Sequence, residues 1–144
     1  MRLLSSLVPQ GYQHFTGVQQ AILKNAEACT ALSKLVSSSL GPNGMNKMVI
    51  NHLEKIFVTS DCGTILSEME VNHPAAKLIC MAADMQSKEK GDSTNLVVSF
   101  CGELLGTARD LLRIGVPIPD IVEGFKRSHA VVLKDLPSLV CHTW

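Results

Sequence analysis

Apolar residues recur at helical spacing along most of this chain. Between residues 16 and 40 they return about every 3.6 positions, which predicts a long amphipathic helix that ends near Gly41 and Pro42. Segments 74–90, 94–114 and 118–137 predict three more helices, and a short helix is expected over residues 63–69. The chain is therefore expected to be mainly α-helical.

One short stretch has strand character instead. "KMVIN" (47–51) and "KIFVTS" (55–60) are rich in β-branched and apolar residues, and "HLE" lies between them. Two short β-prone segments around a tight turn predict a single β-hairpin. The expected fold class is mainly α with one small β-hairpin.

The same spacing predicts which helical residues are buried. Helix 94–114 is apolar on most sides over its first half, which predicts burial all around it. Gly102 and Gly106 lie four residues apart on one face, and each costs about 1 kcal/mol relative to alanine unless another backbone packs closely there. Helix 74–90 is expected to bury Ala75, Leu78, Ile79, Ala82 and Met85.

Composition narrows the function classes. Lys plus Arg and Asp plus Glu are 13 each, so no net charge attracts nucleic acid or an anionic membrane. The five cysteines form no C-x-x-C pair and are expected to be buried thiols in a reducing compartment. Neither a signal peptide nor a membrane span is expected, which predicts a cytoplasmic protein with no nucleic-acid or membrane partner.

The segment "EKGDSTN" (89–95) offers two interpretations of Asp92. Aspartate is a preferred N-cap residue and commonly does nothing more before a helix. Alternatively, free N–H groups at the start of the helix bind phosphate, and a carboxylate beside a phosphate needs a cation such as Mg²⁺ between them. The residues alone leave both interpretations open.

Two other loops contain glycine at a helix end. "LGPNGMNK" (40–47) has Gly41 and Gly44, whose backbone could approach a phosphate, although the spacing is not that of a Walker A loop. "TSDCGT" (59–64) has Asp61, either as an N-cap or as a second carboxylate for a metal. For each loop taken alone, a structural role is favoured.

Together, in this order and spacing, the three loops resemble the nucleotide-binding loops of the group II chaperonins. The resemblance covers roughly residues 12–141 and implies half of an equatorial domain, the part that binds ATP and forms ring contacts. It implies a subunit of a hetero-oligomeric double ring that uses ATP and Mg²⁺ to fold unfolded client proteins. The hairpin would then add strands to the sheet of a neighbouring subunit.

The resemblance also implies roles for individual residues. Asp61 would face the γ-phosphate in the catalytic region, and Asp92 would bind Mg²⁺. Nucleotide contacts would come from Leu40, Gly41, Pro42, Gly44, Gly91, Asp92, Ser93, Thr94 and Asn95.

Two departures from the family pattern bear on function. Ser93 stands where the family has a second glycine, so its Cβ is expected to weaken phosphate binding. Residues 1–144 are expected to be one partial domain without the apical and intermediate domains or the water-activating aspartate of the family, which leaves ATP hydrolysis by this chain uncertain. The alternative is a non-catalytic module that docks on chaperonin subunits.

Overall fold

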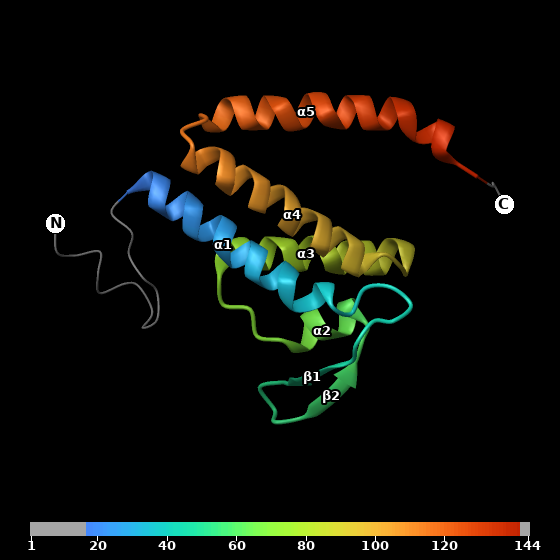
Figure 1. Cartoon of the computed structure of the whole chain (residues 1–144). Helices are drawn as coiled ribbons and strands as arrows, with labels where there is room; N and C mark the ends of the chain where they lie inside the picture. Colours follow the sequence, from blue (N-terminus) through green and yellow to red (C-terminus); the bar gives the residue numbers. More distant parts are fainter. Residues whose placement is uncertain (1–16, 142–144) are drawn as a thin grey trace, which may run out of the picture.

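The computed structural model describes residues 17–141, which form five α-helices, one 3₁₀ helix and one two-stranded sheet (Figure 1). The elements are α1 (Val18–Ser37), β1 (Lys47–Ile50), β2 (Ile56–Thr59), α2 (Cys62–Glu68), α3 (Pro74–Lys90), α4 (Thr94–Arg113), α5 (Ile118–Asp135) and η1 (Leu136–Leu139). The predicted fold class is confirmed. Within this part of the chain, no helix is both long and apolar enough to span a membrane.

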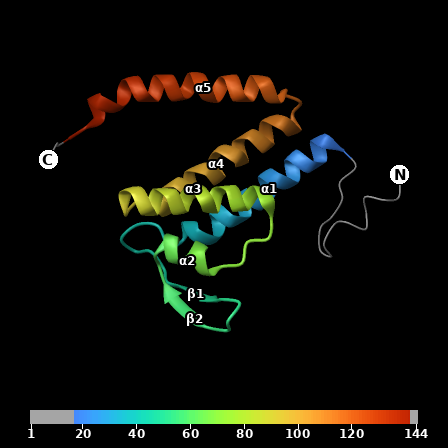
Figure 2. The same cartoon turned by 180° about the vertical axis from the view of Figure 1, so that it is seen from behind.

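Helices α1 and α4 lie side by side and form the centre of the molecule (Figures 1 and 2). A Cβ at Gly102 would collide with the Cβ and Oγ of Ser33, so the two helices approach closely there. The Ser33 hydroxyl donates to the Ser99 carbonyl at 3.3 Å. Close packing thus explains the glycine at position 102, whereas no packing neighbour among residues 17–141 lies within 4 Å of a Cβ placed at Gly106.

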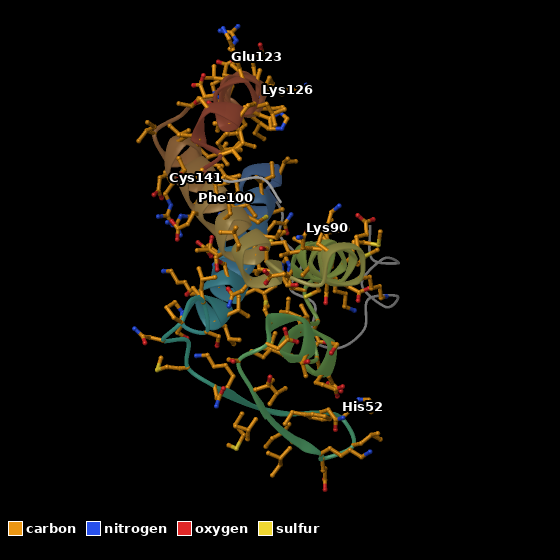
Figure 3. All side chains as sticks on the ribbon, turned by 90° about the vertical axis from the view of Figure 1, so that its right-hand side faces the viewer. His52, Lys90, Phe100, Glu123, Lys126 and Cys141 are labelled. Atoms are coloured by element: carbon orange, nitrogen blue, oxygen red, sulfur yellow. The ribbon has the colours of Figure 1, made fainter. Side chains whose placement is uncertain are left out.

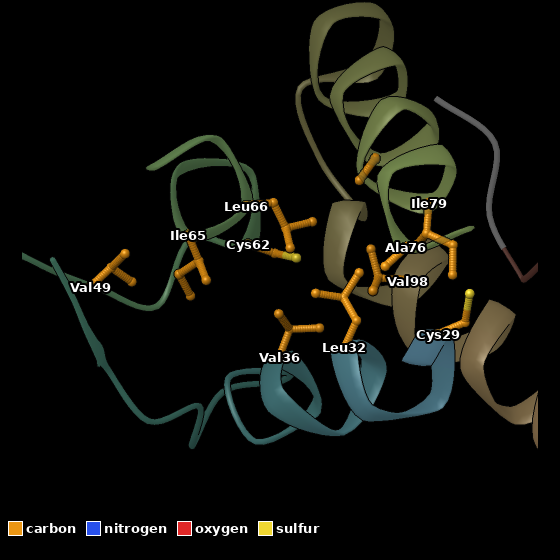
Figure 4. Close-up of a cluster of buried hydrophobic side chains, with 11 residues drawn as sticks. Cys29, Leu32, Val36, Val49, Cys62, Ile65, Leu66, Ala76, Ile79 and Val98 are labelled. Carbon is orange, nitrogen blue, oxygen red and sulfur yellow. The ribbon is translucent and has the colours of Figure 1, made fainter. Parts of the chain in front are cut away.

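The core lies where α1, α2, α3, α4 and the hairpin meet (Figure 4). Its largest fully buried side chains are Val36 of α1, Ile65 of α2 and Val98 of α4. The hairpin contributes Val49 from β1, and α3 contributes small side chains that let it pack closely. This core holds in place the helix ends from which the three loops emerge.

Helix α3 buries a different face from the one predicted. It begins with Pro74 in its first turn, as expected. Its buried residues are Ala76, Ile79 and Ala83. Ala75 is only partly buried, and Leu78, Ala82 and Met85 are exposed, so only Ile79 of the predicted set is fully buried. The face of α3 that meets the core therefore carries two alanines, and small side chains allow close packing between elements.

Helix α4 is not covered on all sides, which contradicts its predicted burial. Among residues 17–141 the side chains that bury it belong mainly to α1 and α3. Leu96 and Phe100, four residues apart, remain exposed, Phe100 by 61%. An apolar stripe on α4 therefore faces solvent.

The hairpin β1–β2 is antiparallel, with Lys47 opposite Thr59 and Ile50 opposite Ile56. Its turn is tied to α2, because the amide of Asn51 donates to Oε2 of Glu68 at 3.0 Å. One face packs through Val49 onto the core. The other face is apolar and exposed, and consists of Met48, Ile50, Ile56 and Val58.

Helix α5 lies at the opposite end of the molecule from the hairpin. Figure 3 shows Glu123 and Lys126 of α5 at one end and His52 of the hairpin turn at the other. Ile121 is the one buried residue of α5, and within residues 17–141 this helix packs mainly on α4 and on η1. Most of its apolar residues are therefore exposed.

The cysteines follow the prediction only in part. Cys29 and Cys62 are buried free thiols, whereas Cys80 and Cys101 are partly buried and Cys141 is exposed. Burial raises the pKa of the Cys62 thiol to about 11, with a smaller contribution from the Asp61 carboxylate. A buried thiol with a raised pKa is chemically inert.

Candidate functional site

The three glycine-containing loops meet around one hollow of about 200 Å³. The first loop (40–47) follows α1, the second (59–64) joins β2 to α2, and the third (91–95) joins α3 to α4. The hollow is lined by Ser39, Leu40, Gly41, Ser60, Asp61, Cys62, Gly91, Asp92, Ser93, Thr94, Asn95 and Leu96. The structure thus brings together residues separated by more than fifty positions in the sequence.

Eight of the ten residues expected at a nucleotide site line this hollow, and Pro42 and Gly44 are not among its lining residues. Gly44 has a local role instead, because a Cβ there would collide with the Ser39 carbonyl. Gly41 has φ +86°, a left-handed conformation that favours glycine. The first loop is held closed by the Ser39 hydroxyl, which donates to the Met45 carbonyl at 2.7 Å.

Asp61 caps α2 and also lines the hollow. Its Oδ2 accepts both the backbone N–H and the hydroxyl of Thr64, each at 2.7 Å. These bonds favour the charged form, led by the Thr64 hydroxyl, and hold the pKa of the Asp61 carboxyl below its ordinary value. Asp61 therefore stays ionised at neutral pH. It can cap α2 and still present a charged carboxylate to the hollow.

Asp92 is not the N-cap of α4. The N-cap is Ser93, which has φ 64° and makes no side-chain cap hydrogen bond. The Oδ1 of Asp92 accepts the Ser93 backbone N–H at 2.6 Å, and the Gln86 side chain donates to the Asp92 carbonyl at 3.0 Å. Gly91, the C-cap of α3, also has a left-handed conformation with φ 71°.

The first two residues of α4, Thr94 and Asn95, have different surroundings. The Asn95 side chain is committed to packing, because its Nδ2 donates to the Val36 carbonyl at 2.8 Å and its Oδ1 accepts the Ser99 hydroxyl. Thr94 differs. It lines the hollow and is only 6% exposed as a whole residue.

The charge of the hollow suits a divalent cation bound together with phosphate. Asp61 and Asp92 are its acidic lining residues, and no lysine or arginine is among the residues that line it. The N-terminus of α4 adds unpaired N–H groups and a partial positive charge. Within residues 17–141 no three His, Cys, Asp or Glu side chains are grouped to hold a metal. Mg²⁺ needs only one or two carboxylates when phosphates and waters complete its shell, so the donor set fits Mg²⁺ with a polyphosphate.

Sequence reasoning missed several members of this site. Ser39, Ser60, Cys62 and Leu96 line the hollow, and Gln86 supports the third loop from α3. Each of these four lining residues is adjacent in the sequence to a predicted site residue, and this adjacency could have identified them. Nothing in the sequence around Gln86 indicates its contact, which depends on the turn made at Gly91.

A larger hollow of about 340 Å³ lies between the first half of α1 and the turn from α4 to α5. Ile22, Leu112 and Val116 are among its lining residues, and none of the described residues that line it is charged. It offers no group for acid–base chemistry or for metal binding.

Comparison with known proteins identifies the family. Residues 32–143 match the family model of the TCP-1/cpn60 chaperonin family. The chain belongs to the TCP-1/cpn60 chaperonin family, and the resemblance to chaperonins seen in the three loops is confirmed.

Theta subunits are among the relatives of this chain. It is 49% identical over 137 residues to the human T-complex protein 1 subunit theta, with 95% of this chain and 25% of that protein covered. It is 48% identical over 137 residues to the Arabidopsis thaliana subunit theta, again with 95% and 25% covered. The chain therefore spans about a quarter of the length of these relatives.

A solved structure shares the fold. A group III chaperonin in the open state matches with a TM-score of 0.80 and 31% sequence identity, covering 86% of this chain and 25% of that one. The helical arrangement with its single hairpin is thus that of a chaperonin.

Proposed function

We propose that this chain is the nucleotide-binding portion of a chaperonin subunit, and that it binds the phosphates of ATP with Mg²⁺ in the hollow between the three loops. One observation carries the proposal. Three loops far apart in the sequence meet at the N-terminus of α4 and bring two carboxylates to one hollow without a basic side chain. A phosphate beside these carboxylates requires a divalent cation.

The residues have distinct roles in this proposal. Asp92 holds Mg²⁺, and Asp61, which also lines the hollow, faces the terminal phosphate. The Thr94 hydroxyl and the first-turn N–H groups of α4 bind phosphate oxygens. The hollow of about 200 Å³ accommodates the phosphate end of the nucleotide rather than all of it, since sites that enclose a whole small molecule are roughly 300–1,000 Å³.

Isothermal titration calorimetry with ATP tests the proposal. The parent chain should bind ATP in the presence of Mg²⁺ and bind much more weakly in EDTA. Asp92→Ala should lose the Mg²⁺-dependent part of the binding, with an affinity reduced at least tenfold, or about 1.4 kcal/mol. Its helical content should be unchanged, because one exposed hydrogen bond is worth only about 1 kcal/mol.

Asp120→Ala is the matched control, since Asp120 is also an exposed acidic residue near a helix N-terminus but lies in the first turn of α5, away from the hollow. It should bind ATP as the parent does. Equal ATP binding by the parent and Asp92→Ala would remove Asp92 from the metal site. Failure of the parent to bind ATP with Mg²⁺ would overturn the proposal.

The wider role follows from the family. As part of a chaperonin subunit, the chain would act with other subunits of a hetero-oligomeric ring in the ATP-dependent folding of client proteins, in the cytoplasm. The hairpin supports a contact between subunits, because neither of its edges pairs with another strand among residues 17–141, and it could extend a neighbour's sheet. The free thiols agree with a reducing compartment.

A second candidate is a docking module without nucleotide chemistry. It is favoured by the apolar outer face of the hairpin, where four side chains are each about 58–68% exposed. Such a patch on a small protein commonly marks a protein contact. Association with chaperonin subunits that is unchanged by ATP, Mg²⁺ and Asp92→Ala would favour this candidate over the first.

A further inference from the structure

The apolar hollow of about 340 Å³ has a wall that is fixed by the backbone of the turn from α4 to α5. The Gly115 N–H donates to the Leu112 carbonyl at 3.1 Å, and Gly115 has φ +95°. The Val116 N–H donates to the Leu111 carbonyl, also at 3.1 Å. These two bonds form a Schellman motif, in which a left-handed residue closes the end of a helix. Leu112 and Val116 are thus held in place where they line the hollow.

The same hollow borders α1 and α5. Ile22 and Leu23 line it from α1, and Ile118, the first residue of α5, lines it and is 42% exposed. Val18, the first residue of α1, is 79% exposed and lies on the same helix face as Ile22, because residues four apart lie one above the other. Apolar side chains therefore continue from the start of α1 to the hollow.

Residues 1–16, which join α1 at Gly17, have the composition and the length to fill the hollow. Residues 3–23 contain no charged side chain, and none of the described residues that line the hollow is charged. Fully extended, residues 9–17 would span about 30 Å, whereas Ile22 lies only about 6 Å along α1 from its first residue. This tether is long enough for the apolar residues that precede it, which are Leu3, Leu4, Leu7 and Val8.

We propose that the apolar side chains at positions 3–8 occupy this hollow, so that the N-terminal segment of the chain packs against α1 and the turn between α4 and α5. The tether keeps the segment at a high effective concentration near the hollow, so a few apolar side chains suffice for binding. The contact joins α5 to α1, whereas the described residues hold α5 mainly through α4 and η1. It does not depend on the proposed nucleotide site.

Hydrogen exchange at the Val116 amide, followed by NMR on the full 144-residue chain, tests the proposal from the side of the segment. In the double variant Leu4→Asp, Leu7→Asp this amide should exchange about tenfold faster than in the parent, because the segment no longer covers the turn. Ser5→Asp, Ser6→Asp is the matched control. It adds the same two charges to the same segment but removes no apolar side chain, so Val116 should exchange as in the parent.

A second pair of variants tests the proposal from the side of the hollow. Ile118→Asp places a carboxylate in the hollow and should accelerate exchange at Val116 to the same extent. Adding Leu4→Asp and Leu7→Asp to it should cause no further increase, because both changes remove the same contact. Val122→Asp is the control, since Val122 is 44% exposed, lies in the same helix and does not line the hollow. It should leave exchange at Val116 unchanged.

The amide of Val98, which is fully buried in the core, reports on the fold as a whole and should exchange equally slowly in every variant. Three results would overturn the proposal. These are unchanged exchange at Val116 in Leu4→Asp, Leu7→Asp, an equal acceleration in the serine control, and an acceleration at Val98 as large as that at Val116. If dilution of the parent removes the protection of Val116, a second copy fills the hollow and the assignment to the chain's own segment is wrong.

Discussion

Ser93 adopts a left-handed backbone conformation where the third loop enters α4. Its φ of 64° is one that side chains with a Cβ avoid, and its hydroxyl provides no cap that would offset the cost. Glycine occupies the corresponding position in the loop that the family resemblance identifies. The serine is therefore a local strain at the edge of the site as well as an added side chain beside it.

Ser93→Gly should raise the free energy of unfolding by about 1 kcal/mol, because glycine adopts this conformation without the steric penalty. Chemical denaturation measures the change. Ser128→Gly, in the interior of α5, is the control and should lower the free energy of unfolding by roughly 0.5 kcal/mol through loss of helix propensity. Destabilisation by Ser93→Gly would show that the serine is not strained.

Asp61 makes stability depend on pH. Its pKa in the folded chain is held low by the Thr64 hydroxyl and by the Thr64 and Gly63 backbone N–H groups. In the unfolded chain the pKa of the same carboxyl is about 3.9. Its stabilising contribution is therefore complete above the unfolded pKa and is lost as the pH falls through the folded pKa.

The stability difference between the parent and Asp61→Asn should be largest above about pH 5 and should shrink as the pH falls below about 4. Thermal melts across this range measure it. Thr64→Val removes the hydroxyl donor but keeps the backbone donor. The stability difference between the parent and Thr64→Val should therefore be smaller than that between the parent and Asp61→Asn, and it should shrink over the same pH range. A difference that stays constant with pH would mean that the pKa of Asp61 is not lowered by folding.

At the scale of elements, the packing of α1 on α4 depends on one glycine. Gly102 and Gly106 are indistinguishable by helical spacing, yet only Gly102 lies against α1. Ser33, which it contacts, is buried and bonded to the Ser99 carbonyl, so it cannot move aside freely. The two glycines thus provide a matched pair.

Gly102→Ala should lower the free energy of unfolding by about 1–3 kcal/mol through overpacking against Ser33. Gly106→Ala should raise it by about 1 kcal/mol, since alanine is the better helix former and its Cβ would meet no described neighbour within 4 Å. Urea denaturation of both variants measures the changes. If both substitutions changed the free energy of unfolding in the same direction, the close packing of α1 on α4 at Gly102 would be contradicted.

The helices and the hairpin could be predicted from the sequence because their apolar spacing and their Gly and Pro boundaries are local signals. The orientation of α3 could not. Leu78 and Met85 are more hydrophobic than Ala76 and Ala83, yet they are exposed, because close helix packing favours the small residues. A pattern of hydrophobicity reports that a helix has an apolar side but not which part of it another helix covers.

The candidate site was predictable to a similar extent. Each loop contains a recognisable glycine or aspartate, and the resemblance relates the loops to one another. The roles of Asn95 and Gly44 were not predictable, because one depends on the distant Val36 carbonyl and the other on the closure of its own loop. Such contacts exist only once the chain has folded.

At the scale of the whole molecule, extensive apolar surface remains exposed. It includes the outer face of the hairpin, Phe100 on α4 and most of α5. Soluble monomers rarely expose contiguous apolar patches larger than a few hundred Å². The chain spans about a quarter of its theta relatives, and we expect it to self-associate and to bind a hydrophobic dye when it is alone.

The double variant Met48→Thr, Val58→Thr should reduce self-association in sedimentation velocity and reduce dye binding. Its free energy of unfolding should change by no more than about 0.5 kcal/mol, because both side chains are exposed. Val49→Ala, on the buried face of the same strand, should lower the free energy of unfolding by about 2 kcal/mol. A monomeric parent without dye binding would contradict this prediction.

Titration of the ¹⁵N-labelled chain with ATP and Mg²⁺, followed by NMR, reports where the nucleotide binds. If the hollow between the three loops is the nucleotide site, the amide resonances of Gly41, Gly91 and Thr94 should shift with Mg²⁺ present, while those of Gly115 and Gly124 should remain in place. This difference is expected because the first three residues line the hollow and the last two do not. Shifts confined to the apolar hollow at Gly115, or no shifts at all, would contradict it.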